Sequence, residues 1–265
     1  MTSTPSMQFA RIIVGAAVNN RAILDNCLRR SPEIASDQLP LTIQEGCVSA
    51  AQAYNRILDL APAGALVVFV HQDVYLPAGF AERLRAAVGG VESIAPDWAV
   101  LGGLGLDRKR RLAGRVWSTG LQEFIEGSLP LPAATETLDE YMLVLRNDGR
   151  LRFDEALPGF HLYAADIIQQ GISQGRTSYA IDLPVIHHDR LVGKLDRHYH
   201  RAYNYIARKW WKRLPLRNLV VDIHIVPFLM WRRDWQIRQR ARREARPEIP
   251  MSDPAMIARK IGLEG

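Results

Sequence analysis

Short apolar runs alternate along the chain with longer segments in which apolar residues recur every three or four positions. Runs that are almost entirely apolar are typical of strands buried on both faces of a sheet. They predict strands at Arg11–Val18, Gln38–Ile43, Ala65–Val70, Leu138–Leu145 and Ser178–Ile186. The helical spacing predicts helices at Asn20–Arg30, Ser49–Leu60, Ala78–Val88, Leu162–Gln174 and Asp196–Lys212.

This alternation at short loop lengths predicts an α/β fold with a mostly parallel central sheet and helices on both faces. Ala99–Leu106 is glycine-rich and extended. Asp107–Glu136 carries a basic cluster followed by Gly, Pro and Ser, so we expect a loop region over the active face. Ligands of such sheets bind at the carboxyl ends of the strands.

Asp73 follows the most apolar of the predicted strands and ends the tripeptide His71-Gln72-Asp73. A carboxylate at an open strand end suits a hard divalent cation such as Mg²⁺ or Mn²⁺, which takes most of its other ligands from phosphates and water. A helix N-cap or turn, in which the carboxylate accepts from backbone N–H groups, fits the position equally well. The residue alone leaves both interpretations open.

His187 and His188 end a later predicted strand of the same sheet. An imidazole there would complete the coordination around Asp73, although backbone hydrogen bonds satisfy most such histidines. Carboxylates near the active end of the sheet suit the deprotonation of an acceptor hydroxyl, and surface or capping roles fit each of them as well. The candidates are Asp139-Glu140, Asp154-Glu155 and Asp166.

Five segments, in this order and spacing, resemble the family-2-like glycosyltransferases of GT-A fold. They are Ser49-Ala50-Ala51 with Tyr54-Asn55, Val67–Pro77 (VVFVHQDVYLP), Leu138–Arg146 (LDEYMLVLR), Leu151–Ile167 (LRFDEALPGFHLYAADI) and Val185–Asp189 (VIHHD). The similarity points to the bacterial branch with an HQDV version of the DXD motif. It implies a GT-A-like domain at residues 1–195, followed by a basic helical extension at residues 196–265.

The resemblance implies roles at the donor site. Asp73 matches the last Asp of the DXD motif, which binds the metal bridging the diphosphate, and His71 stands at the first acidic position. His188 matches the histidine that joins the metal in several GT-A enzymes. Two further matches, Val18 and Asn19, would lie near the nucleobase. A third, Asn55, would lie near the nucleotide pocket.

The resemblance also implies catalytic positions. Asp139 and Glu140 would lie beside the donor sugar, and Asp166 falls where the last Asp of an ExD-type cluster falls. Asp166 is therefore the first candidate for the catalytic base and Asp139 the second. Ala164 and Ala165 replace acidic or polar residues that are common beside that position.

The implied activity is metal-dependent, inverting transfer of a sugar from a nucleotide sugar of the uridine diphosphate type, with Mn²⁺ or Mg²⁺. The expected acceptor is an envelope glycan, a polysaccharide or a lipid-linked molecule. A non-catalytic protein that binds a nucleotide sugar or a glycan on the same scaffold is the alternative.

Charge changes the expectation only for the C-terminal fifth. The net charge is +6, yet thirteen Lys or Arg and only three acids lie between Arg201 and Pro247, so the rest of the chain is slightly acidic. That balance argues against nucleic acid as a partner. Basic residues interleaved with Trp and Leu suit an anionic membrane surface, while a helical cap on the core and a homodimer contact are the alternatives.

No secretory signal and no membrane-spanning apolar run is evident, and two cysteines are too few for a disulfide framework. We expect a cytoplasmic protein, peripheral at the inner face of the membrane if the basic segment binds lipid.

Overall fold

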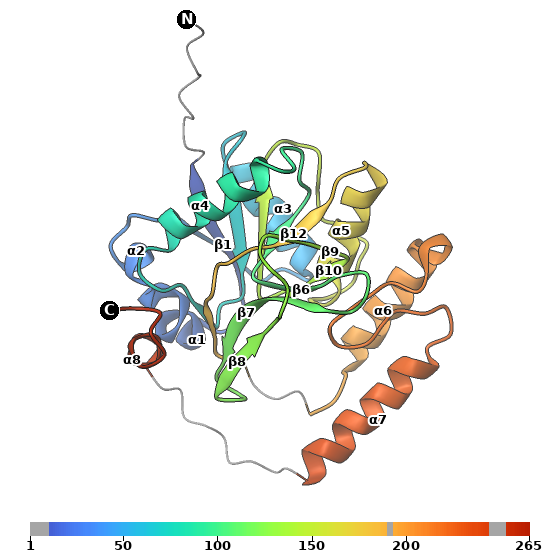
Figure 1. Cartoon of the computed structure of the whole chain (residues 1–265). Coiled ribbons are helices and arrows are strands. Elements are labelled where there is room, and N and C mark those ends of the chain that lie inside the picture. The colour runs from blue at the N-terminus through green and yellow to red at the C-terminus, as the bar shows by residue number, and fades with distance from the viewer. Residues whose placement is uncertain (1–10, 190–192, 244–252) are drawn as a thin grey trace, which may run out of the picture.

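A computed structural model of the chain describes residues 11–189, 193–243 and 253–265 (Figure 1). Within these residues, one seven-stranded sheet forms the centre of the molecule. Its strands, in spatial order, are β2 (Leu41–Glu45), β1 (Ile12–Val18), β3 (Leu66–Val70), β11 (Met142–Arg146), β5 (Leu101–Gly102), β12 (Ser178–Ala180) and β9 (Ala133–Thr135).

The direction of the strands differs across this sheet. β2, β1 and β3 are mutually parallel, as is the pair β12–β5. β11 runs antiparallel to both β3 and β5, and β9 runs antiparallel to β12. The α/β class is confirmed: five of the seven strands run in one direction, and β11 and β9 are the antiparallel exceptions. The hydrophobic runs alone could not reveal this difference, because a strand buried on both faces has the same pattern in either direction.

Helices cover both faces of the central sheet, as predicted. Alternate residues of β3 mark the two faces: Leu66, Val68 and Val70 belong to one hydrophobic cluster, and Val67 and Phe69 to the other. The first cluster includes residues of α1 (Arg21–Asn26), the 3-10 helix η1 (Leu28–Arg30), α2 (Pro32–Ala35) and α4 (Phe80–Glu92). The second includes residues of α3 (Ala50–Leu60), α5 (Tyr163–Ser173) and α6 (Arg197–Lys209).

A second, smaller sheet lies beside the carboxyl ends of β1 and β3. Its strands are β10 (Thr137–Leu138), β6 (Leu104–Leu106), β7 (Leu112–Ser118), β13 (Ile186–His187) and β4 (Val74–Tyr75), with β8 (Glu123–Glu126) paired to β7. The prediction of a loop over Asp107–Glu136 is therefore wrong, since β7, β8 and β9 occupy much of that range. The predicted strands Leu138–Leu145 and Ser178–Ile186 are each divided between the two sheets.

Helix α6 belongs to the main core rather than to a separate extension. Tyr199, Ala202, Tyr203 and Ile206 are all buried in the cluster that α3 and α5 share. Amphipathic spacing in α6 turns an apolar face toward the sheet, and the division into residues 1–195 and 196–265 stays a prediction.

Three shorter or outer elements follow: the 3-10 helix η2 (Trp211–Arg213), α7 (Phe228–Arg243) and α8 (Pro254–Lys260). α7 extends from the body, and α8 returns to pack near α1 (Figure 1). Part of the predicted basic segment, including Arg246, lies outside the described residues. None of the described helices combines the length and apolarity needed to cross a bilayer.

Candidate metal and ligand site

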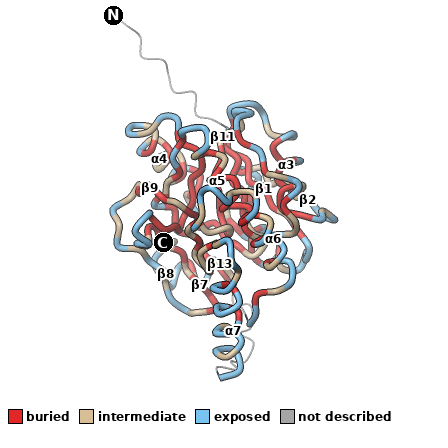
Figure 2. The backbone as a smooth tube through the Cα atoms, turned by 90° about the vertical axis from the view of Figure 1, so that its right-hand side faces the viewer, coloured by how far each residue is buried: buried red, intermediate tan, exposed pale blue. Residues whose placement is uncertain are grey.

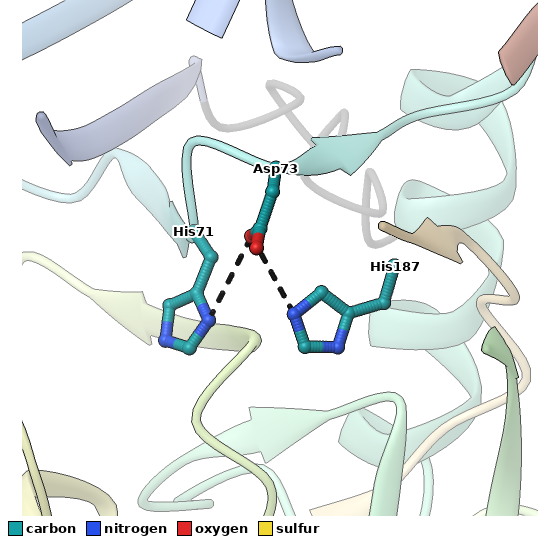
Figure 3. A group of neighbouring side chains, drawn as sticks. All are labelled: His71, Asp73 and His187. Atoms are coloured by element: carbon teal, nitrogen blue, oxygen red, sulfur yellow. Dashed lines mark ion pairs between the residues drawn. The ribbon is translucent and has the colours of Figure 1, made fainter. Parts of the chain in front are cut away.

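Three side chains converge where β3 leaves the central sheet (Figure 3). His71 and Asp73 lie between β3 and β4, and the antiparallel pairing of β13 with β4 sets His187 opposite Val74. Asp73 Oδ1 is 3.5 Å from His187 Nε2 and 4.0 Å from His71 Nδ1. One ligand atom from each residue lies within 4.8 Å of the other two, which is close enough for a single metal ion.

One oxygen of the Asp73 carboxylate is left unexplained by the N-cap or turn interpretation, although Asp73 lies in a turn. Its Oδ1 atom is buried and has no hydrogen-bond partner among the described residues. The 3.5 Å contact with His187 is longer than an ordinary N–H···O bond. A buried carboxylate oxygen without a donor is costly, so this atom fits a cation that would bind it.

The charges of the three residues depend on one another. Burial would raise the pKa of Asp73, but His187 and His71 lower it to about 2. Burial would lower the pKa of His187, yet the adjacent Asp73 raises it above the ordinary value. For His71 burial prevails, so its pKa is lowered and the neutral imidazole that a metal requires is favoured.

Tyr163 fixes which nitrogen of His71 carries the proton. The Tyr163 hydroxyl donates to the backbone carbonyl of Glu140 (2.8 Å), so toward His71 Nε2, 2.9 Å away, it can only accept. His71 Nε2 must then be protonated, and the lone pair of Nδ1 is directed toward Asp73. An imidazole whose second nitrogen is held in this way is typical of metal ligands.

Two cavities meet at His71. The first, here called the β1 cavity, has a volume of about 540 Å³ and is lined by residues that include Val18, Asn19, Tyr54 and Asp73. The second, called the α6 cavity, has a volume of about 640 Å³, and its lining includes Asp139, Glu140, Lys194 and Tyr199. His71, one of the three candidate ligands, therefore borders two spaces that each suit a small ligand.

The loop carrying Asp73 is tied to the end of β1. The Gln72 side-chain oxygen accepts from the backbone N–H groups of Asn19 and Asn20, both at 3.0 Å. Its amide donates to Asn19 Oδ1 at 2.6 Å. The predicted nucleotide-site residues Val18, Asn19, His71 and Asp73 thus line one cavity, because β1 and β3 are parallel and end at the same edge.

Asn55 does not reach that cavity. Its Nδ2 donates to the carbonyl of Phe153 and to Glu155, both at 2.9 Å, and its Oδ1 accepts from the Phe153 N–H. The residue is buried between α3 and the turn at residues 153–155. Its contacts hold this turn against the helix, in place of the expected role beside the nucleotide.

Asp166 also lies away from both cavities. Its carboxylate is 2.7 Å from Lys209 Nζ and accepts from Trp210 Nε1 and Gln170 Nε2, each at 2.8 Å. The side chain is 2% exposed. The expected first choice for the catalytic base is therefore fully occupied by an ion pair and two hydrogen bonds, and these contacts join α5 to the end of α6.

His187, rather than the expected His188, faces Asp73. Successive side chains of a strand point to opposite sides, so only one of two adjacent histidines can reach the group. The ring of His188 instead lies 3.1 Å from the Thr119 hydroxyl, while its backbone N–H donates to the Asp73 carbonyl at 2.8 Å. The sequence signalled a strand-end pair, but choosing between them requires the register with β4.

Asp139 and Glu140 line the α6 cavity. Burial raises the pKa of the Glu140 carboxyl to about 8, against the opposing effect of the Ala164 N–H, which donates to it at 3.1 Å. The raised pKa favours a protonated Glu140 carboxyl at neutral pH.

No protein family model matches the chain. A Fuscovulum blasticum protein called ATP synthase subunits region ORF 6 is 31% identical over 169 residues, which cover 59% of this chain and 64% of that protein. The chain therefore spans less than two thirds of that relative.

Two solved structures are similar in part. The structure of S. aureus TarS 1–349 has 13% identity and a TM-score of 0.43, covering 76% of this chain and 65% of that one. GalNAc-T7 with UDP, GalNAc and Mn²⁺ has 11% identity and a TM-score of 0.48, covering 92% and 59%. At these scores the likeness decides neither the fold family nor the activity.

Proposed function

We propose that this protein is a metal-dependent glycosyltransferase of the GT-A kind that uses a nucleotide-sugar donor. One observation carries the proposal: His71, Asp73 and His187 form a candidate ligand group at the strand end, and His71 lines both the β1 cavity and the α6 cavity. A group transfer between two substrates needs such a position, because donor and acceptor must meet at the reacting bond.

The β1 cavity suits the nucleotide half of the donor. Its volume of about 540 Å³ lies in the range of small-ligand sites. Asn19 and Arg21 contribute polar groups to the lining, while Tyr54 and Phe160 contribute aromatic surface. The choice of a uridine nucleotide rests on the resemblance of the five segments, not on a contact with a base.

The ligand set favours Mn²⁺ over Mg²⁺. Two imidazoles and one carboxylate form a mixed nitrogen and oxygen set, whereas Mg²⁺ takes oxygen ligands almost exclusively. A bound cation would neutralise the charge that develops on the departing diphosphate. Asp73 and the two histidines would hold it, with the remaining positions left to phosphate and water.

The α6 cavity suits the acceptor, an envelope glycan, a polysaccharide or a lipid-linked molecule. Glu140 and Asp139 lie in its lining, where a carboxylate would take the proton of the attacking hydroxyl. Asp166 drops out of this role because Lys209 and Trp210 occupy it. Glu140 is therefore the preferred base.

The test is calorimetric binding of uridine diphosphate with and without Mn²⁺, followed by turnover of a panel of uridine, guanosine and thymidine diphosphate sugars. We expect binding that depends on Mn²⁺ and is abolished in Asp73→Asn. Asp182→Asn, in which an exposed carboxylate outside both cavity linings is changed, is the matched control.

Three results separate the alternatives. Turnover of one donor that Asp73→Asn abolishes supports the enzyme. Tight, Mn²⁺-dependent binding with no turnover favours a non-catalytic nucleotide-sugar or glycan-binding protein instead. Equal and weak responses to every donor, with or without Mn²⁺, contradict both.

A further inference from the structure

Helix α7 turns an aromatic face away from the body of the protein. Phe228, Trp231 and Trp235 are 60%, 56% and 61% exposed, and their spacing puts them on one side of the helix. The buried residues Met230 and Asp234 lie on the other side. In Figure 2 the helix projects below the domain and is mostly exposed. Exposed tryptophans grouped on one side of a helix indicate an interaction surface.

The same helix is strongly basic. Within Phe228–Arg243 the only acidic residue is Asp234, and Arg238 binds it at 2.9 Å. The arginines of the helix are Arg232, Arg233, Arg238, Arg240, Arg242 and Arg243. Arg232 and Arg242 fall on the aromatic side by helical spacing. The partner should therefore be both apolar and negatively charged.

Two exposed aliphatic residues directly precede the helix. Ile225 and Val226 are 68% and 61% exposed. We call these two residues, together with Phe228, Trp231 and Trp235, the α7 face. It combines aliphatic and aromatic side chains with flanking arginines, although no described helix can cross a bilayer.

We propose that the α7 face docks on the surface of an anionic lipid bilayer. Tryptophan is favoured at the depth of the headgroups, aliphatic side chains gain by entering the acyl boundary, and arginine meets lipid phosphate. Each basic residue near an anionic surface strengthens binding roughly fivefold, so the arginines supply affinity that the apolar area alone lacks.

Two other occupants explain the α7 face less well. Single-stranded nucleic acid would use the aromatic rings and the arginines, but it leaves Ile225 and Val226 without a role, because bases stack on rings. A second copy of the chain would cover the apolar residues, but it would bring two sets of arginines together. A lipid surface satisfies both the apolar and the basic residues.

Helix α7 is connected to the lining of the α6 cavity, so docking would also position this cavity; this step rests on the proposed function. Asp234 accepts from the backbone N–H of Leu195 at 2.6 Å, and Leu195, Lys194 and Gly193 line the α6 cavity. Val220, also in that lining, is 39% exposed and precedes the α7 face in the chain. Docking would hold the acceptor cavity close to the lipid, so the acceptor would be an amphipathic molecule carried by the membrane.

The test is sedimentation of the full-length protein with vesicles of equal parts phosphatidylglycerol and phosphatidylcholine. We expect binding that high salt weakens, that vesicles of phosphatidylcholine alone do not support, and that Trp231→Ala with Trp235→Ala weakens at least about tenfold. Ile94→Ala is the matched control, since this residue is 62% exposed just beyond α4 and far from α7. Thermal melting should show both variants folded.

The proposal is overturned if the wild type ignores anionic vesicles, or if the double tryptophan variant binds them as well as the wild type does. Tryptophan-dependent dimerisation, or tryptophan-dependent binding of an oligonucleotide, in place of vesicle binding would overturn it as well. Binding of uridine diphosphate with Mn²⁺ is measured on the same samples. If the wild type does not bind uridine diphosphate, the proposed function is contradicted, but the vesicle result is unaffected.

Discussion

At the scale of single residues, the contacts of each carboxylate decide which of them is free for chemistry. Asp73 has a buried oxygen that accepts no hydrogen bond, whereas Asp166 has a lysine, an indole and an amide around it. Both are acids in segments that resemble functional motifs, so the sequence predicts a functional role for each of them. The difference arises only when α6 packs against α5 and delivers Lys209 to Asp166.

Replacement of the two adjacent histidines separates the structural assignment from the one the sequence favoured. His187→Ala removes one of three ligands, and we expect Mn²⁺ affinity to fall at least about 100-fold, since even loss of an outer partner of a ligand costs 10–100-fold. His188→Ala, the matched control, should bind Mn²⁺ almost like the wild type. Calorimetry with Mn²⁺ alone measures both. A larger loss in His188→Ala would contradict the assignment.

Glu140 gives a prediction about pH. Its pKa is about 8 in the folded protein and close to the ordinary 4.5 when unfolded, so the folded state holds the proton more tightly. The stability contributed by neutral Glu140 is therefore complete below pH 4.5 and is lost as the pH rises toward 8. Glu140→Gln, neutral at every pH, should melt at a higher temperature than the wild type above pH 8.

The difference in melting temperature between Glu140→Gln and the wild type should vanish toward pH 4.5, measured by thermal scans without metal. A constant difference across the range would contradict the raised pKa. If Glu140 is the base, Glu140→Gln should also lose transfer while retaining nucleotide binding.

At the scale of elements, helix α8 packs against the strands next to the candidate metal ligands. Tyr75 and Ile186, which face each other across β4 and β13, form a small cluster with Ala258 of α8. Each lies close in sequence to a ligand: Tyr75 follows Asp73 by two residues, and Ile186 precedes His187. The positions of Asp73 and His187 thus depend on a helix that is far away in the chain.

Glu264 tests that support. It accepts from the Tyr75 hydroxyl at 2.9 Å and from the Ala78 N–H at 2.8 Å. Glu264→Ala leaves both donors without this partner, so we expect a loss of about 1–3 kcal/mol in the free energy of unfolding and weaker Mn²⁺ binding. Met256→Ala, which changes an exposed residue of α8, should alter neither. Unchanged Mn²⁺ binding in Glu264→Ala would contradict a positioning role.

Elements that form from local pattern were predictable, and those defined by distant pairing were not. β1, β3, α3 and α5 match predicted ranges because each buries a continuous run or a regular stripe of apolar residues. The short strands of the second sheet carry weak local signals between glycines and basic residues. Their pairing partners, such as β13 with β7 and β4, lie far away in sequence.

At the scale of the whole molecule, residues after 195 complete the fold rather than follow it. Lys209 of α6 lies 2.6 Å from Asp154 and 2.7 Å from Asp166, and so connects α6 to α5 and to the turn at residues 153–155. Burial would raise the pKa of Asp154, but Lys209 and Tyr205 hold it below the ordinary value. The ion pairs of Lys209 with Asp154 and Asp166 thus lie on the face of the sheet that α3 and α5 cover.

Lys209→Met therefore tests whether the molecule is one cooperative unit. The substitution leaves two carboxylates without their cation, one of them almost fully buried, so we expect a loss of about 3 kcal/mol, the lower end for broken buried pairs because Lys209 is partly exposed. Lys212→Met, which removes an exposed lysine whose Nζ lies 5.4 Å from the centre of the exposed Trp211 ring, should change stability little. Denaturant unfolding followed by circular dichroism and by tryptophan fluorescence measures the effect.

Because α6 lies in the same core as α3 and α5, both signals should shift together in one transition. Two separate transitions, of which only the second keeps the wild-type midpoint, would instead identify residues 196–265 as an independent unit and restore the boundary that the sequence predicted.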